Sequence, residues 1–289
     1  KTAREAVRPT ALLTGPVRDK ALRAMAAAIA ESEEAILAAN ETDVDAVGKS
    51  MTGYENRERV RDAVARIRMT ADDVKALVDR LHRIADLPDP LGDVLGRHDE
   101  PNGLQVGRVR VPIGVIGIVS ELSPLETIDA LALCLKSGNV CVFRGSPDWT
   151  HTQQIIAAGL TTAMAEAGIP RGACTIIDRP EKEAALELIK SGKALDSIIP
   201  RGGAGLRKVV QEQAKMPILC HDGGITHVYI DDDVEIPLAQ NIVVNSKVQN
   251  PSAPNSLDTL LVHQGIARTL LLVLILRLRD EFKIDIYCC

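Results

Sequence analysis

The chain has 289 residues, enough for one large domain or two of ordinary size, and its 46% hydrophobic and 25% charged residues are typical of a globular protein. Lysines and arginines number 34 against 39 acidic residues, a formal net charge of −5, and only 2% of the residues are aromatic. These values exclude a general nucleic-acid binder, because no basic excess is present to neutralise phosphates and few rings are present to stack on bases.

The first part of the chain, residues 1–86, is predicted to be helical. Apolar residues recur there at the spacing of a helix face, as in Ala71–Ala85, where Thr70 is the expected N-cap. Two prolines in Leu87–Pro90 end this helical region.

Beyond residue 100, segments with the pattern of a strand alternate along the chain with segments that have the pattern of a helix. Strands are predicted at Leu104–Val111, Val115–Val119, Val140–Phe143, Cys174–Ile177, Ser197–Ile199, Ile218–Cys220, His227–Ile230 and Thr259–Val262. Helices are predicted at Ile128–Leu135, Gln153–Ala167, Glu181–Lys190 and Leu206–Ala214, with one more after Asp231–Asp233 and one at the end. This order of strand and helix is typical of a mostly parallel sheet covered by helices.

The sequence favours a cytoplasmic protein without a membrane span. Lys1–Arg8 is charged and lacks the apolar segment of a signal peptide. The longest purely apolar run, Leu270–Leu276, is far shorter than the roughly 20 residues that cross a bilayer. None of the six cysteines forms a C-x-x-C pair, so we interpret them as reduced thiols rather than disulfides or zinc ligands.

Two glycine-containing loops with an arginine follow predicted strands. In a parallel sheet, ligands bind at the carboxyl ends of the strands, and glycines there let backbone N–H groups approach an anion. Arginine adds donors suited to phosphate, so the loops favour a nucleotide or phosphorylated ligand, although the glycines alone would also make tight turns. The candidate residues are Arg144, Gly145 and Ser146 in the first loop and Arg201, Gly202, Gly203, Ala204 and Gly205 in the second. We interpret Gly114–Gly117 as close packing around a strand.

Several motifs resemble one enzyme family. They are Leu87–Gly92, Leu104–Gly117, Leu133–Asn139, Ile199–Leu206 and His227–Asp231. Together they resemble gamma-glutamyl phosphate reductase, also called glutamate-5-semialdehyde dehydrogenase, of the aldehyde dehydrogenase superfamily. The likeness runs from about Glu5 to about Val262, and Ile199–Leu206 is highly specific to that family.

The resemblance implies an aldehyde-dehydrogenase-like α/β fold. A cofactor-binding, Rossmann-like domain is expected over residues 1–232, with the N-terminal helices at 1–86 and an oligomerisation-type strand near 104–111. The truncated start of a catalytic domain is expected over 233–289. The exposed strand near 104–111 implies a homo-oligomer or association with an intact relative.

The resemblance also implies an activity, the NADPH-dependent reduction of L-glutamyl 5-phosphate to glutamate-5-semialdehyde in proline biosynthesis. In the family a cysteine thiolate attacks the acyl phosphate, and an asparagine with backbone N–H groups stabilises the oxyanion. Arg144, Gly145 and Ser146 would lie near the adenosine ribose and its phosphate, and the loop from Arg201 to Gly205 near the pyrophosphate.

The family's catalytic residues are replaced in this sequence. Pro254, before Asn255, stands where the nucleophilic cysteine belongs, and a proline can neither attack nor donate an N–H. Leu125 replaces the asparagine of the oxyanion site, and Ser123 replaces an arginine. We therefore expect catalysis to be lost or impaired, which leaves two alternatives: a non-catalytic homologue that binds cofactor or oligomerises, and an inactive fragment.

Other candidate groups are assigned structural roles. Cys220 beside His221 is not interpreted as a nucleophile, because neighbouring residues of a strand face opposite sides. His221 with His227 is not interpreted as a metal pair, and Asp231–Asp233 is interpreted as a solvated linker rather than a cation site. The final helix is apolar on every side at Leu270–Leu276 and is expected to need cover from a further segment or a partner.

Overall fold

The computed structural model describes residues 2–51, 57–121, 124–179, 181–220, 224–251, 253 and 255–288, without the side chains of 57–59, 62, 66 and 124–127. The chain forms two compact units, Lys1–Cys220 and His221–Cys289. The sequence analysis placed the boundary after residue 232, and the roles it gave the two parts stay predictions. None of the helices in the described ranges has the length and apolar character needed to cross a bilayer.

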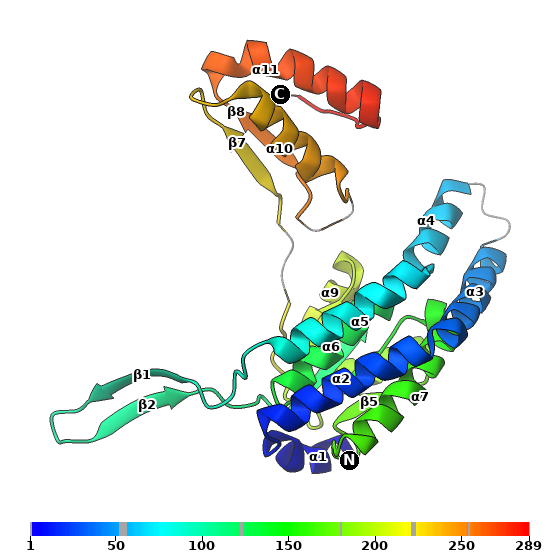
Figure 1. Cartoon of the computed structure of the whole chain (residues 1–289), viewed down its shortest axis with the longest axis vertical. Coiled ribbons are helices and arrows are strands. Elements are labelled where there is room, and N and C mark those ends of the chain that lie inside the picture. Colours follow the sequence, from blue (N-terminus) through cyan, green and yellow to red (C-terminus); the bar gives the residue numbers. More distant parts are fainter. Residues whose placement is uncertain are drawn as a thin grey trace. The chain divides into compact units, whose positions relative to one another are not determined.

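Unit 1 begins with the helices expected over residues 1–86. They are α1 (Thr2–Ala11), α2 (Gly15–Glu31), α3 (Glu33–Ser50), α4 (Arg57–Ile67) and α5 (Ala71–Asp86). Thr70 caps α5 as predicted: its hydroxyl accepts the N–H of Asp73, and the Asp73 carboxylate accepts the N–H of Thr70 in return. Helices α2 and α5 pack side by side (Figure 1).

A four-stranded parallel sheet lies within unit 1, in the order β5-β4-β3-β6. Its strands are β3 (Val115–Ser120), β4 (Val140–Arg144), β5 (Cys174–Ile176) and β6 (Ser197–Arg201). The connecting and following helices are α6 (Pro124–Lys136), α7 (Thr150–Glu166), α8 (Lys182–Lys190) and α9 (Ala204–Gln213), with a short 3₁₀ turn, η1 (Pro147–Trp149), before α7. The predicted parallel α/β architecture is confirmed.

The two faces of this sheet bury two separate apolar cores. On β3, Ile116 and Ile118 point into a core shared with α2, α3, α5, α6 and α7, whereas Val115 and Val119 point into a core shared with α1, α8 and α9. This alternation follows from the two-residue period of a strand. A Cβ at Gly117 would lie 2.6 Å from Leu195 Cδ1, so this glycine allows close packing, as the sequence analysis expected.

The predicted strand over Ile218–Cys220 is not formed. Ile218 makes only an isolated parallel bridge to Ile198, at the outer side of β6. Conversely, β6 continues past its predicted end at Ile199 through Pro200 and Arg201. Proline lacks the ladder donor, but Pro200 still aligns with Val119 of β3.

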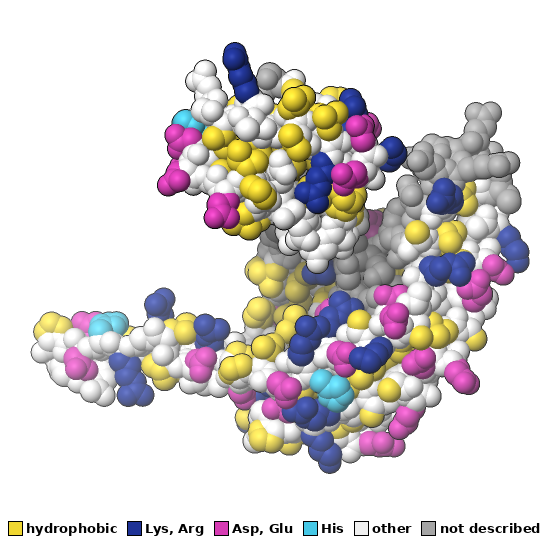
Figure 2. All heavy atoms as spheres, turned by 45° about the horizontal axis from the view of Figure 1, so that its top comes forward, with side chains coloured by type: hydrophobic (Ala, Val, Ile, Leu, Met, Phe, Trp, Pro, Cys, Tyr) yellow, Lys and Arg dark blue, Asp and Glu magenta, His cyan; other side chains and the backbone are white. Residues whose placement is uncertain are grey.

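An antiparallel hairpin of unit 1 joins β1 (Val94–Asp99), which the sequence analysis did not predict, to β2 (Gln105–Val109), which it did (Figure 1). All residues of β1 and most of β2 are exposed. Figure 2 shows charged and hydrophobic side chains mixed along its surface. The exposed apolar side chains include Val94, Leu95, Leu104, Val109 and Val111.

Unit 2 contains a two-stranded parallel sheet with two helices. The elements are β7 (His227–Ile230), α10 (Ile236–Val248), β8 (Thr259–Val262), α11 (Gln264–Leu276) and the π-helical turn η2 (Arg277–Glu281). Leu270, Leu274 and Leu278 are buried in the core of this unit. Leu272, Val273 and Leu276 of the same apolar helix are exposed, by 67% at Leu272, and yellow side chains are spread over the face of unit 2 seen in Figure 2.

Candidate functional site

The two loops predicted to bind an anion lie on either side of the carboxyl end of β3. Arg144 pairs with Val119 on one side of β3, and Arg201 pairs with Ser120 on the other. The backbone N–H of Glu121, the residue directly after β3, donates to the carbonyl of Arg201 at 2.8 Å, which keeps Glu121 beside the second loop. The parallel register therefore brings the Arg144 and Arg201 loops, far apart in sequence, to one edge of the sheet.

Arg144 is almost completely buried beneath the first loop. Its Nη2 donates to the carbonyl of Glu181 at 3.2 Å. Burial lowers the pKa of its guanidinium, and the nearby carboxylates of Glu121, Glu181 and Asp148 act in the opposite direction. These acidic neighbours offset the charge of Arg144 at the edge of the sheet.

The backbone after Arg144 turns sharply into α7. The Ser146 hydroxyl accepts the N–H of Asp148 at 3.3 Å and also lies 3.0 Å from the Asp148 carboxylate. A Cβ on Gly145 would lie 2.2 Å from Gln153 Oε1 and 2.8 Å from the ring of Trp149, which is 1% exposed. Glycine is therefore required at 145 by close approach rather than by a positive φ.

The second loop leaves the N-terminus of α9 open. Gly203 is the N-cap of α9, and no atom lies within 4 Å of a Cβ built on Gly203 or Gly205. Gly203, Ala204 and Gly205 are all exposed, whereas Gly202 lies against Glu121, whose Oε2 would be 2.7 Å from its Cβ. The glycine backbone at the start of α9 is thus open on its side-chain side, and an anion can approach this helix N-terminus there.

A hollow of about 230 Å³ lies next to the first loop. It is lined by residues of the first half of α7 and by residues at and just after the end of β5, namely Gln153, Gln154, Ala157, Ile176 and Asp178. Gln154 Nε2 donates to both oxygens of Asp178, at 3.1 and 3.2 Å. The Oε1 atom of buried Gln153, which faces Gly145, has no hydrogen-bond donor among the described residues.

Gln153 and Asp178 border this edge, although neither belongs to a motif that predicts a site. Gln153 was assigned only to a helical pattern, and Asp178 follows the predicted strand Cys174–Ile177 without a distinctive motif. Their position after the ends of β4 and β5 is the signal that identifies them, because side chains there border the ligand edge of a parallel sheet.

The residues predicted to replace the catalytic groups are only partly described. Pro254 and Ser123 lie outside the described residues, and Leu125 belongs to α6 with its side chain outside the description. Asn255 is exposed, in a turn where the N–H of Ser256 donates to the carbonyl of Ala253. The assignment of Pro254 and Leu125 to catalytic positions stays a prediction.

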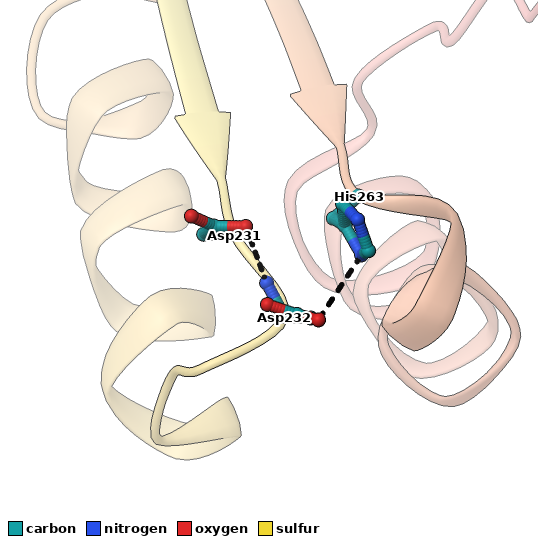
Figure 3. Close-up of side chains that lie close together, drawn as sticks. All are labelled: Asp231, Asp232 and His263. Atoms are coloured by element: carbon teal, nitrogen blue, oxygen red, sulfur yellow. Dashed lines mark hydrogen bonds and ion pairs between the residues drawn. The ribbon is translucent and has the colours of Figure 1, made fainter.

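A second group of ionisable side chains lies in unit 2, at the ends of β7 and β8, and Figure 3 shows Asp231, Asp232 and His263 close together. One ligand atom from each lies within 4.8 Å of the others. Asp231 Oδ1 accepts the N–H of Asp232 and the hydroxyl of Tyr229, which lowers the pKa of the Asp231 carboxyl. His263 Nδ1 accepts the N–H of Gly265 as the N-cap of α11.

These hydrogen bonds give the side chains structural roles: Asp231 stabilises the turn after β7, and His263 caps α11. The sequence analysis did not foresee that His263 joins Asp231 and Asp232, because β8 had to be paired with β7 first. His221, named beside Cys220, lies outside the described residues, and Cys220 itself is exposed.

Comparison with known proteins gives a consistent result. A model of the "Aldehyde dehydrogenase family" matches residues 1–280. The chain is 39% identical over 279 residues to the gamma-glutamyl phosphate reductase of Moorella thermoacetica, covering 96% of this chain and 65% of that protein. The crystal structure of the gamma-glutamyl phosphate reductase from Thermotoga maritima aligns with a TM-score of 0.86 at 31% identity, over 97% of this chain and 66% of that one.

A more distant structure shares the fold. The betaine aldehyde dehydrogenase of Staphylococcus aureus, solved in complex with NAD+, aligns with a TM-score of 0.66 at 22% identity, over 96% of this chain and 52% of that one. The chain thus spans about 65% of the length of the Moorella relative and a smaller share of the betaine enzyme.

Proposed function

Because the chain belongs to the aldehyde dehydrogenase family and is a homologue of gamma-glutamyl phosphate reductases, we propose that it binds a nicotinamide dinucleotide, NADPH or NADP, at the carboxyl edge of its parallel sheet. The observation that carries this proposal is the placement of the Arg144 and Arg201 loops on either side of β3. The fold of the betaine aldehyde dehydrogenase solved with NAD+ supports a dinucleotide as the ligand class.

The residues of this edge fit such a cofactor. The open N-terminus of α9, with exposed Gly203 and Gly205, suits the pyrophosphate, because backbone N–H groups and the helix dipole favour an anion. Arg144, Gly145 and Ser146 would lie at the adenosine ribose and its phosphate. When bound, NADPH would supply a hydride.

We propose further that this chain does not reduce L-glutamyl 5-phosphate. Pro254, at the position of the family's nucleophile, has no thiol, so the covalent route is absent. Leu125, at the position of the oxyanion donor, has no side-chain N–H to offer in place of the asparagine amide, and loss of one such donor raises a barrier by about 3–4 kcal/mol.

Two measurements on the pure full chain test the proposal. Titration with NADPH, followed by the cofactor's own fluorescence, is expected to saturate; absence of saturable binding would mean that the chain binds no cofactor. A coupled assay with glutamate-5-semialdehyde, phosphate and NADP is expected to show no turnover, with the Thermotoga maritima relative as the active control. Clear turnover would contradict the loss of catalysis.

The hairpin supports a second candidate function, association with a further copy of this chain or with an intact relative. Its two strands pair with each other, and both carry exposed apolar residues such as Leu95 and Val109. We expect the full chain to sediment as an oligomer at micromolar concentration, and the double variant Leu95→Lys with Val109→Lys to shift it toward the monomer. A wild-type chain that stays monomeric, alone and with an intact relative, would remove this candidate.

A further inference from the structure

The carboxylate of Asp43, in one of the N-terminal helices, caps the N-terminus of α7. Asp43 of α3 is 3% exposed, accepts from three donors and lies within hydrogen-bond distance of a fourth polar atom. Its Oδ1 accepts the backbone N–H of His151 at 3.1 Å and lies 2.7 Å from His151 Nδ1. Its Oδ2 accepts the backbone N–H of Thr152 at 2.8 Å and the Thr152 hydroxyl at 2.7 Å.

Asp43 does for α7 what a local N-cap side chain does in other helices. The residue at the N-cap position is Trp149, whose side chain makes no capping hydrogen bond. The first N–H groups of a helix have no partner within it, and an acidic group beside them is favoured by the helix dipole. Because Asp43 lies in α3, the start of α7 is fixed by a residue 108 positions away from His151 in the sequence.

The neighbouring residue Asn40 reinforces this link one turn earlier on α3. Its Nδ2 donates to the carbonyl of Ile67 at 2.8 Å and lies 3.4 Å from the Thr152 hydroxyl, and its Oδ1 accepts the N–H of Met69 at 2.7 Å. The Asn40 side chain, which lies beside the Thr152 hydroxyl, is therefore itself hydrogen-bonded to the segment before α5. Asp43 and Asn40 give the first turn of α7 a rigid support.

The same turn of α7 contacts the first loop of the candidate site. Gln153 follows Thr152 directly, and its Oε1 approaches Gly145 so closely that a Cβ there would be 2.2 Å away. Gln153 and Gln154 also line the hollow beside that loop. The path from Asp43 to the site thus runs through Thr152 and Gln153 to Gly145.

We propose that Asp43 is a positioning residue for the dinucleotide site: its buried carboxylate fixes the first turn of α7 and so holds the loop from Arg144 to Trp149 in the shape that receives the adenosine half of the cofactor. This inference rests on the proposed function for the cofactor itself. The part of the inference that concerns the structural order of the loop in the cofactor-free chain does not depend on the proposed function.

The experiment compares the full chain with the Asp43→Ala variant. Removal of the carboxylate leaves the buried N–H of Thr152 and the part-buried N–H of His151 without their acceptor. NADPH titration is expected to give a dissociation constant about tenfold higher or more. Amide hydrogen exchange is expected to become faster over residues 144–152 in the cofactor-free chain.

Two further variants separate positioning from general loss of stability. Val44→Ala removes buried apolar volume from the next residue of α3 without touching the capping hydrogen bonds, so it is expected to lower stability and leave both the NADPH affinity and the exchange at 144–152 close to wild type. Asp43→Asn keeps the size and one accepting oxygen, and we expect intermediate values; it carries the test if Asp43→Ala does not fold.

The outcomes distinguish this inference from the function on which it rests. Folded Asp43 variants with wild-type affinity and wild-type exchange over 144–152 would overturn the positioning role. An equal loss of affinity in Val44→Ala would also overturn it, because the effect would then follow stability alone. A wild-type chain that binds no NADPH would overturn the dinucleotide site and with it the cofactor part of this inference, while the exchange data would still decide whether Asp43 orders the loop.

Discussion

Gly145 offers a sharp test of how tightly the first loop is packed. In Gly145→Ala the new Cβ would lie 2.2 Å from Gln153 Oε1 and 2.8 and 2.9 Å from Cζ2 and Cη2 of Trp149. The glutamine end can swing away, but the Trp149 ring is 1% exposed and packs against Phe143, with ring centroids 6.2 Å apart. The ring or the backbone must therefore move.

The magnitude follows from this contact. Overpacking of a buried site costs about 1–3 kcal/mol, so we expect the free energy of unfolding of Gly145→Ala to fall by that amount. For a unit of this size each kcal/mol lowers the melting temperature by about 2–4 °C. Trp149 is the chain's single tryptophan, so its fluorescence during urea unfolding reports on this loop directly.

The matched control is Gly203→Ala, where the backbone has a φ of −69° and no atom lies within 4 Å of the new Cβ. Alanine is a weaker N-cap than glycine, so we expect the free energy of unfolding to fall by about 0.5–1 kcal/mol, which is less than in Gly145→Ala. If a pyrophosphate approaches this backbone, the added methyl group weakens NADPH binding by more than this small loss of stability explains. Wild-type stability and unchanged Trp149 emission in Gly145→Ala would refute the packing argument.

Other changes test separate features of the fold. Thr70→Ala is expected to lower the free energy of unfolding by about 1 kcal/mol through loss of the capping box of α5, whereas Ser32→Ala, at an N-cap without a side-chain hydrogen bond, should change little in the same urea titration. Exposed Cys220 is expected to react with a thiol reagent in the native chain, and buried Cys141 only after unfolding, which mass spectrometry of the labelled chain would show or contradict. Burial raises the pKa of the Cys174 thiol above its ordinary value of 9.0, so the folded state holds this proton more tightly than the unfolded state. The protonated Cys174 thiol therefore contributes fully to the free energy of unfolding below pH 9, and this contribution declines as the pH rises beyond 9. The free energy of unfolding of a Cys174→Ala variant, measured by urea titration at several pH values, should fall less steeply above pH 9 than that of the wild type.

Local patterns were enough to predict the sheet of unit 1. The apolar run at Val115–Val119 and the helices on both sides of it indicated a buried parallel strand, and the structure confirms it as the centre of the sheet. The same reasoning placed Arg144 and Arg201 at one edge, because each follows a strand. In a parallel sheet the carboxyl ends of all strands lie at the same edge, so the residues that follow the strands in the sequence lie near one another in space.

Features that depend on distant partners escaped the sequence analysis. β1 carries Gly96, Arg97 and His98 without an apolar alternation, and it becomes a strand only because β2 pairs with it. Ile218 had the apolar character of a strand, yet it forms only one bridge, after Pro217. The support of α7 by Asp43 joins residues too far apart for any local pattern to reveal.

The order of the elements along the chain has a consequence for synthesis. Helices α2 and α3 pack against α7, which follows them by about a hundred residues. At a translation rate of 5–20 residues per second, α3 leaves the ribosome on the order of ten seconds before α7. During that interval Ile29 and Ile36, buried in the finished protein, have an incomplete cover. The nascent helical layer therefore exposes apolar surface that a holding chaperone can bind until α7 is made.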